Sequence, residues 1–203
     1  PEMRANMDRV LSRDMEILGM FRHGLDGNWK LYMENVRDTY HATLLHSFFP
    51  TFGLVRLSMK GGIVLSDGGL HHMTYSMGAT DQAEAQYNAK DLRAVKDGYT
   101  LNAPELIEGW PEYECGTTLA IQSIFPNFSV QQLSNVITVR LNVPKGPDKS
   151  ELIWWILAPV EDTPEERAMR LRQSNLIGPG GFIAMEDGAV VGWVRRGLAG
   201  AED

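Results

Sequence analysis

TTLAIQSIFPNFSVQQLSNVITVRLNVPKGPDKSELIWWILAP, residues 117–159, is a segment typical of consecutive β-strands. Its apolar runs are rich in β-branched and aromatic residues, and short turn signals separate them at Pro126-Asn127, Ser134-Asn135 and 145–148. The last two runs, NVITVRLNV and ELIWWILAP, have the spacing of a hairpin. Strands that follow one another without intervening helices pair antiparallel, so we expect an antiparallel sheet here.

The residues on either side of this segment predict several helices and a few more strands. Before it, hydrophobic periodicity and turn residues predict a helix over 1–12, a strand over 15–23 and a long helix over 28–49 that Pro50 ends. Two strands are predicted next, at LVRLSM (54–59) and HHMTYSM (71–77). Helix and loop are then expected over 79–97, and irregular chain over 98–114. After it, the capping box Thr163-Pro164-Glu165-Glu166 begins a helix to about residue 176, and a last helix follows at about 182–197. Helices and strands are grouped and do not alternate, which predicts one α+β domain over residues 1–203.

The composition argues against several classes of function. Lys and Arg number 19 against 26 Asp and Glu, the net charge is −7, and no basic run is present, so we expect no nucleic-acid partner. No apolar run approaches the roughly 18 residues of a membrane span, so we expect no membrane association. The single cysteine, Cys115, cannot form an internal disulfide, which is typical of a cytoplasmic protein. One cysteine also cannot hold an iron–sulfur cluster.

The stretch ENVRDTYHATLLH, residues 34–46, contains two of the five histidines. Two imidazoles and one carboxylate on one side of an iron form the metal site of many non-haem Fe(II) oxygenases. His41 and His46 are five residues apart, which places them about 140° apart around a regular helix. Their rings converge only if the helix is bent or ends nearby, which Pro50 and Gly53 favour. A structural, hydrogen-bonded pair of histidines on an apolar helix is the alternative that this spacing leaves open.

Two aspartates are candidates to complete such a site. Asp38 precedes His41 by three residues, so both lie on one helix face, and its carboxylate can fix the ring tautomer of a metal-bound His41. Asp187 is the best candidate for the third ligand. It follows the break Gly178-Pro179-Gly180-Gly181, which can direct the last helix, and its neighbours are largely apolar.

Two motifs in the chain resemble the signatures of one enzyme family. The first comprises Asn28-Trp29-Lys30, Glu34-Asn35, Asp38-x-Tyr40-His41 and His46. The second comprises Asn175-Leu-Ile-Gly178-Pro179-Gly180-Gly181-Phe182, followed by Glu186-Asp187-Gly188. Together they resemble the catalytic domain of the large (alpha) subunit of Rieske non-haem iron aromatic-ring-hydroxylating oxygenases, over nearly the whole chain. Three further stretches are similar to the branch that acts on anthranilate, salicylate and similar benzoates: Phe52-Gly53-Leu54, Ile124-Phe125-Pro126 and Gln131-Gln132.

The resemblance implies a fold and a set of site residues. The implied fold is α+β of the helix-grip (Bet v1-like or START-like) type, in which helices pack over one face of an antiparallel sheet. The implied iron ligands are His41, His46 and Asp187, and Asp38 would bridge His41 to a histidine of a Rieske cluster in a neighbouring subunit. The resemblance also implies that Asn35 lies beside the iron and that three residues line the substrate pocket: Ala42, Ile177 and Ile183.

The same resemblance implies cofactors and partners. The enzyme would use Fe(II) and O2 to hydroxylate an aromatic, benzoate-type substrate, as a mono- or dioxygenase. Electrons would come from NAD(P)H through a separate reductase, sometimes with a ferredoxin, and through a 2Fe-2S Rieske cluster. The family's large subunits form homotrimers, sometimes with small beta subunits. Its Rieske domain is absent from these residues, so we expect a catalytic-domain fragment, inactive alone, with that domain upstream.

Other classes of site fit the sequence less well. A zinc hydrolase of the His-Glu-x-x-His type and a two-oxoglutarate oxygenase with His-x-Asp both lack their motifs here. The alternative is a helix-grip binding module that carries an apolar ligand without a metal. An anionic benzoate would need a cationic or amide partner in the cavity, and the sequence offers four candidates: Arg56, His71, Gln131 and Gln132.

Overall fold

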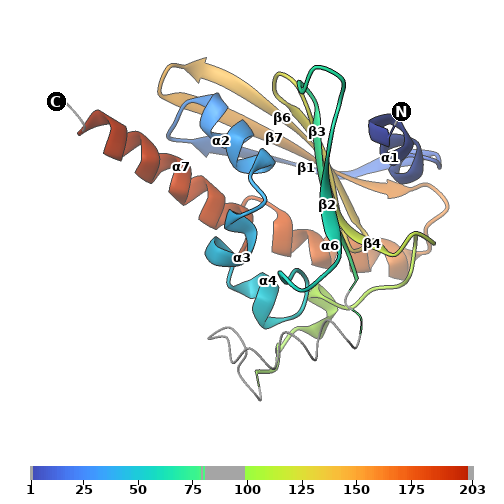
Figure 1. The fold of residues 1–203 in the computed structure, drawn as a ribbon. Helices are drawn as coiled ribbons and strands as arrows, with labels where there is room; N and C mark the ends of the chain where they lie inside the picture. The colour runs from blue at the N-terminus through green and yellow to red at the C-terminus, as the bar shows by residue number, and fades with distance from the viewer. Residues whose placement is uncertain (1, 79, 81–98, 201–203) are drawn as a thin grey trace.

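The computed structural model describes residues 2–78, 80 and 99–200, and its centre is one antiparallel sheet (Figure 1). The strands are β1 (Met15–Leu25), β2 (Gly61–Leu65), β3 (His72–Met77), β4 (Thr117–Ile124), β5 (Phe128–Leu133), β6 (Val136–Gly146) and β7 (Lys149–Pro159). Their order across the sheet is β1-β7-β6-β5-β4-β3-β2. The four strands that the sequence predicts between residues 117 and 159 therefore lie side by side, and the chain's first strand pairs with its last.

Helices pack on this sheet mainly from one side. The helical elements are α1 (Glu2–Val10), α2 (Trp29–Arg37), α3 (His41–Leu45), α4 (Phe48–Thr51), the 3-10 helix η1 (Pro104–Leu106), α6 (Pro164–Ile177) and α7 (Ala184–Ala199). Buried side chains of α2, α4, α6 and α7 pack on β4 to β7 from this side, whereas α1 lies on the opposite side of the strands (Figure 1). The predicted α+β, helix-grip architecture is confirmed.

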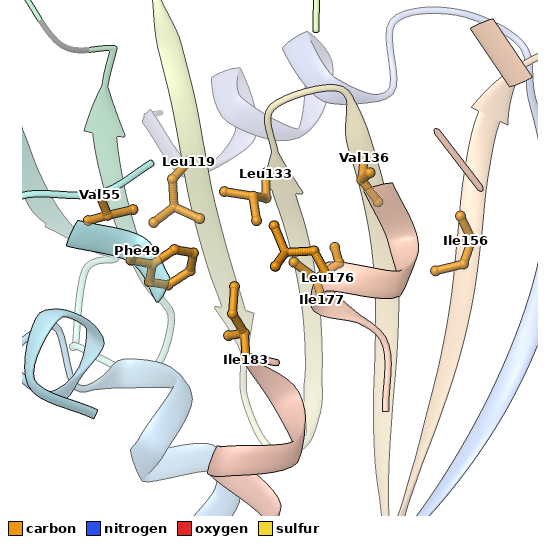
Figure 2. Close-up of a cluster of buried hydrophobic side chains, with 9 residues drawn as sticks. All are labelled: Phe49, Val55, Leu119, Leu133, Val136, Ile156, Leu176, Ile177 and Ile183. Atoms are coloured by element: carbon orange, nitrogen blue, oxygen red, sulfur yellow. The ribbon is translucent and has the colours of Figure 1, made fainter. Parts of the chain in front are cut away.

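Alternation along the strands divides the core between the two faces of the sheet. On β6, Val136 faces the helices, while the next residue, Ile137, faces α1 and packs with Val10. Figure 2 shows the cluster on the helix side: Phe49, Val55, Leu119, Leu133, Val136, Ile156, Leu176, Ile177 and Ile183. This cluster joins four strands to α4, α6 and the start of α7. It therefore fixes the two helical regions that carry the histidines and the second motif.

Two local predictions are wrong and one is confirmed. The helix expected over 28–49 is three helices, because the backbone leaves the helical conformation at Asp38 and again at His46. Residues 54–59 form bends and turns and no strand, because the amides of Leu54 and Val55 bond to the carbonyl of Phe49, within α4. The capping box is confirmed: Thr163 and Glu166 accept hydrogen bonds from each other's amide groups.

Two further expectations concern regions without a regular element. The helix and loop expected over 79–97 fall outside the described residues, apart from residue 80. The segment expected to be irregular, 98–114, contains only η1 among its described residues. Among the helices that the structure describes, none combines the length and the hydropathy that crossing a membrane requires.

Candidate metal centre

Two breaks in the helical region bring the histidines together. Asp38 ends α2 in an extended conformation, and its Oδ1 accepts a hydrogen bond from the amide of Tyr40 at 2.8 Å. This local hydrogen bond takes up an amide that a continuous helix would bond within its own backbone. It therefore favours a break after α2 and the start of a separate helix, α3. His41 is then the first residue of α3, and His46, at φ −89° and ψ 76°, follows its last. The ring centroids lie 5.2 Å apart, so the angular separation of a regular helix does not apply.

Asp187, in the first turn of α7, meets both rings. Its Oδ1 lies 3.1 Å from Nε2 of His46 and 3.5 Å from Nε2 of His41. One ligand atom from each of the three residues lies within 4.8 Å of the other two. His46 is only 2% exposed and Asp187 8%, whereas the side chain of His41 is 21% exposed. The predicted donor set thus converges at a buried point with one more accessible side.

The other nitrogen of each ring faces a second carboxylate. Nδ1 of His46 lies 2.8 Å from Oε2 of Glu186, and Nδ1 of His41 lies 3.4 Å from Oδ2 of Asp38. The first contact is a well-formed hydrogen bond, whereas the second is not aligned as one. A carboxylate that accepts the Nδ1 proton leaves the Nε2 lone pair free for a metal. Sequence reasoning assigned no role to Glu186, although it stands beside Asp187 in the second motif.

This arrangement favours a cation between the rings and Asp187. If Nδ1 of His46 donates to Glu186, Nε2 of the neutral ring cannot donate to Asp187, and two acceptors face each other at 3.1 Å. Oδ1 of Asp187 is buried and makes no aligned hydrogen bond within the described residues. A buried carboxylate oxygen in that position is costly unless a hydrogen-bond donor or a cation pairs with it. Two nitrogens and one carboxylate are a donor set that suits Fe(II), so the residues fit the predicted metal.

The close approach of carboxylates and imidazoles also shifts the pKa values of His46 and Asp187 in the direction that favours a proton between them. Burial lowers the pKa of the His46 imidazole, but the carboxylates of Asp187 and Glu186 outweigh burial and raise it above its ordinary value. Burial likewise raises the pKa of Asp187, yet its contacts with His41 and His46 bring it below the usual range. Positive charge is therefore favoured at this point, whether a proton or a metal ion supplies it.

The junction between α6 and α7 sets the position of Asp187. A Cβ on Gly181 would lie 2.3 Å from the carbonyl oxygen of Leu176 and 2.4 Å from that of Asn175, both in the last turn of α6. Only glycine allows this approach. The chain then turns so that α7 begins at Ala184, and the amide of Asp187 bonds to the carbonyl of Ile183. The glycine-rich break predicted to direct the last helix is present here.

A cavity of about 350 Å³ opens beside the three donors. The three predicted pocket residues, Ala42, Ile177 and Ile183, lie in its wall, and so does Asn35, which was predicted to lie beside the iron. Other wall residues come from α4, from the turn after it and from β2 to β7, and they are mainly apolar. This volume falls within the range of small-molecule sites, about 300–1,000 Å³, and the mixture of apolar walls with a few polar groups is typical of them.

The four candidate partners for a carboxylate are divided between the cavity and other places. Arg56 and Gln131 line the cavity, whereas His71 and Gln132 are absent from its wall. Nδ1 of His71 accepts the amide hydrogen of Phe125, and the Gln132 amide group donates to backbone carbonyls, so both have structural bonds.

Sequence reasoning missed a cationic residue in the cavity wall, Arg140 on β6. It is only 4% exposed, and its Nη1 donates to the Tyr32 hydroxyl at 2.8 Å. Its Nε and Nη2 are buried without a hydrogen-bond partner within the part of the chain that the structure describes. A signal was present in the sequence, because alternation along NVITVRLNV places Arg140 on the same face as the core residue Val136.

Known proteins share both the sequence and the fold of this chain. The chain is 49% identical over 201 residues to the alpha 2 subunit of the terminal oxygenase component of terephthalate 1,2-dioxygenase from Comamonas sp, covering 99% of the chain and 49% of the relative. It is 40% identical to the large subunit of anthranilate 1,2-dioxygenase from Burkholderia cepacia, covering 97% of the chain and 47% of the relative. The chain thus spans about half the length of these relatives.

A solved structure of naphthalene 1,2-dioxygenase from Rhodococcus sp. bound to indole has the same fold. The TM-score is 0.71 at 20% identity, over 95% of this chain and 47% of that one. The family model described as ring hydroxylating alpha subunit (catalytic domain) matches residues 6–202. The chain therefore belongs to the family of ring-hydroxylating alpha subunits, in the part that forms their catalytic domain.

Proposed function

We propose that this chain is the mononuclear-iron catalytic domain of an oxygenase that hydroxylates an aromatic, benzoate-type acid with O2. The observation that carries the proposal is the convergence of His41, His46 and Asp187 beside a largely apolar cavity. Relatives of this chain are named as oxygenases of terephthalate, anthranilate and salicylate, all of which are aromatic carboxylates. Iron held by three ligands on one side supplies O2 activation at its remaining positions.

The residues around the metal ligands have separate tasks in this proposal. Glu186 would hold the Nδ1 proton of His46, whereas Asp38, 3.4 Å from Nδ1 of His41, would attract that ring by charge from a more exposed position. Asp38 would also bridge His41 to a histidine ligand of a Rieske cluster in a neighbouring subunit, which gives electrons a path to the site. Its side chain is 49% exposed, as a residue that meets another subunit would be in an isolated chain.

The apolar wall of the cavity would hold the aromatic ring and exclude water. Ala42, Ile177 and Ile183 present small or aliphatic side chains to the cavity, and Asn35 adds an amide group near Asp38. The aliphatic side chains among them offer a flat aromatic ring an apolar surface. Excluding water from the site strengthens each electrostatic interaction within it.

Arg140 supports a benzoate-type substrate. A buried guanidinium with two unpaired nitrogens is costly until an anion pairs with them, and a carboxylate can accept both hydrogen bonds at once. Nε1 of Trp154, the cross-strand neighbour of Arg140 on β7, is also buried without a partner among the described residues. Both residues line the cavity. The substrate's carboxylate would therefore lie against β6 and β7.

Membership of the family supports proposals for the remaining cofactors and partners. One cysteine cannot hold a two-Cys, two-His cluster, so the 2Fe-2S Rieske cluster requires residues beyond these 203. We propose that it lies in a domain upstream and receives electrons from NAD(P)H through a reductase, with or without a ferredoxin. The assembly would be a cytoplasmic homotrimer, with or without small beta subunits, and this domain would be inactive alone.

Reconstitution of the full-length subunit tests the proposal. The iron-loaded protein, supplied with NAD(P)H, its electron donors and isotopically labelled O2, should place labelled oxygen on terephthalate or benzoate. A His41→Ala variant should fold, contain little iron and form no product. A folded wild-type protein without affinity for Fe(II) that still binds these aromatic acids would contradict the oxygenase and indicate a metal-free carrier.

A further inference from the structure

We propose that Tyr32 positions Arg140, and thereby gives the cavity its selectivity for a ring that carries a carboxylate. This inference rests on the proposed function of the cavity and goes one residue further, to a side chain outside the cavity wall. Tyr32 lies on α2, is 1% exposed and is not among the residues that line the cavity. It would act on the ligand only through Arg140.

Tyr32 occupies one end of the guanidinium. Nη1 of Arg140 donates to the Tyr32 hydroxyl at 2.8 Å, in a contact between two buried side chains 108 positions apart in the chain. An arginine carries its five N–H groups in a fixed planar fork. Once Nη1 is held, the Nε and Nη2 hydrogens form the remaining edge, and their spacing matches the two oxygens of a carboxylate.

Trp154 fixes the plane of the same group. The Arg140 Cζ lies 4.7 Å from the centroid of the Trp154 ring, and the two residues pair across β6 and β7. A guanidinium over an indole face is attracted to it, and this contact limits rotation out of the plane. Arg140 is thus held at one end and against one face before any ligand arrives, so binding costs little ordering of this side chain.

The Tyr32 hydroxyl does not neutralise Arg140, so the positive charge remains available to bind an anionic ligand. Burial raises the pKa of Tyr32 to about 12, so the phenol is neutral when it accepts the hydrogen bond. A carboxylate in its place would neutralise Arg140 and remove the attraction for an anionic ligand. A neutral acceptor instead orients the guanidinium and preserves its positive charge.

Binding of two matched probes tests the role of Tyr32 in the full-length, iron-loaded protein. Benzoate and benzamide have the same size and planarity, but only benzoate is charged. In Tyr32→Phe the Kd for benzoate should rise about tenfold, the order expected for a charged hydrogen-bond network, while the Kd for benzamide changes little. Hydroxylation of benzoate should also yield a broader mixture of ring positions. Equal affinity losses for both probes would overturn the inference, as would an unchanged benzoate Kd.

Two further variants separate this inference from the proposed function. Tyr113→Phe removes a hydroxyl from a second tyrosine, which is half-buried and whose ring faces a different arginine, Arg9, and this variant should leave both Kd values unchanged. Arg140→Met should abolish the preference for benzoate over benzamide. If Arg140→Met has no effect, the proposed carboxylate site fails. If Arg140→Met has its effect and Tyr32→Phe does not, only the positioning role fails.

Discussion

Glu186 is the single residue whose role is clearest from contacts and least evident from sequence. Its Oε2 lies 2.8 Å from Nδ1 of His46, on the side of the ring opposite Asp187. Replacing Glu186 by Gln keeps the size but offers a weaker acceptor to the ring, so the tautomer that points a lone pair at the proposed iron is less favoured. We expect Fe(II) affinity to fall by roughly 10–100-fold, the usual effect of losing such a partner.

Anaerobic titration of the full-length apoprotein with Fe(II) measures this effect directly. Glu165→Gln is the matched control, because Glu165 is an exposed residue in the first turn of α6. It should bind Fe(II) as the wild type does. Equal affinities for Glu186→Gln and the wild type would show that His46 is oriented by its burial alone.

Among the elements, the junction between α6 and α7 decides whether Asp187 reaches the histidines. A side chain at Gly181 would meet two carbonyl oxygens of α6 at less than 2.5 Å, so Gly181→Ala must move one helix relative to the other. We expect the free energy of unfolding to fall by about 1–3 kcal/mol, as overpacking does, and Fe(II) affinity to fall with it. Urea unfolding and Fe(II) titration are the two measurements.

At Gly197, within α7, we expect substitution by Ala to raise the free energy of unfolding instead of lowering it. No atom lies within 4 Å of a Cβ added there, so Gly197→Ala meets no obstacle and should stabilise the helix by about 0.5–1 kcal/mol. If the two substitutions change the free energy of unfolding in opposite directions, the effect at Gly181 comes from the close contact between α6 and α7. It would then not be a general effect of replacing glycine in or near a helix. A neutral or stabilising Gly181→Ala would mean that the junction relaxes freely.

Across the whole molecule, a buried cluster of charges joins parts of the chain that are distant in sequence. Arg170 on α6 is fully buried and makes two hydrogen bonds to Glu112 and two to Asp162. Glu112 also accepts hydrogen bonds from Arg13 and Asn135. The cluster ties the irregular segment before β4 to the last third of the fold. Such groups are stable only as a set, because removing one leaves others unpaired.

This cluster predicts a stability that depends on pH. Burial raises the pKa of Glu112, but Arg170, Asn135 and Arg13 outweigh it and bring the pKa below its ordinary value. The stabilisation is therefore complete above the unfolded pKa, about 4.3, and disappears as pH falls through the lower folded value. Glu112→Gln should reduce the free energy of unfolding by about 3 kcal/mol at pH 7.

Urea unfolding between pH 7 and pH 3 tests this prediction as a difference between Glu112→Gln and the wild type. That difference should shrink as pH falls, because protonated Glu112 resembles the amide. Other carboxylates titrate equally in both proteins and cancel. A difference that stays constant with pH would mean that Glu112 contributes by packing and that its charge has no part.

Local sequence indicated most of the elements and singled out the candidate metal ligands. Alternation and turn residues predicted β4 to β7, a capping box predicted the start of α6, and two motifs singled out His41, His46 and Asp187. These features depend on neighbours a few residues away, which the sequence shows directly. Where a local polar bond competed with helix periodicity, as at Asp38, the prediction of one long helix was wrong.

Only the tertiary structure decided which distant side chains meet. Three contacts show this. Glu186 meets His46 across 140 positions of the chain, and Tyr32 accepts a hydrogen bond from Arg140 across 108. Glu112 pairs with Arg170 across 58 positions. Such distances depend on strand register, on where helices break and on how they pack on the sheet. Periodicity shows which face of an element is buried, but the partner on the other side is chosen by packing and charge across the whole fold.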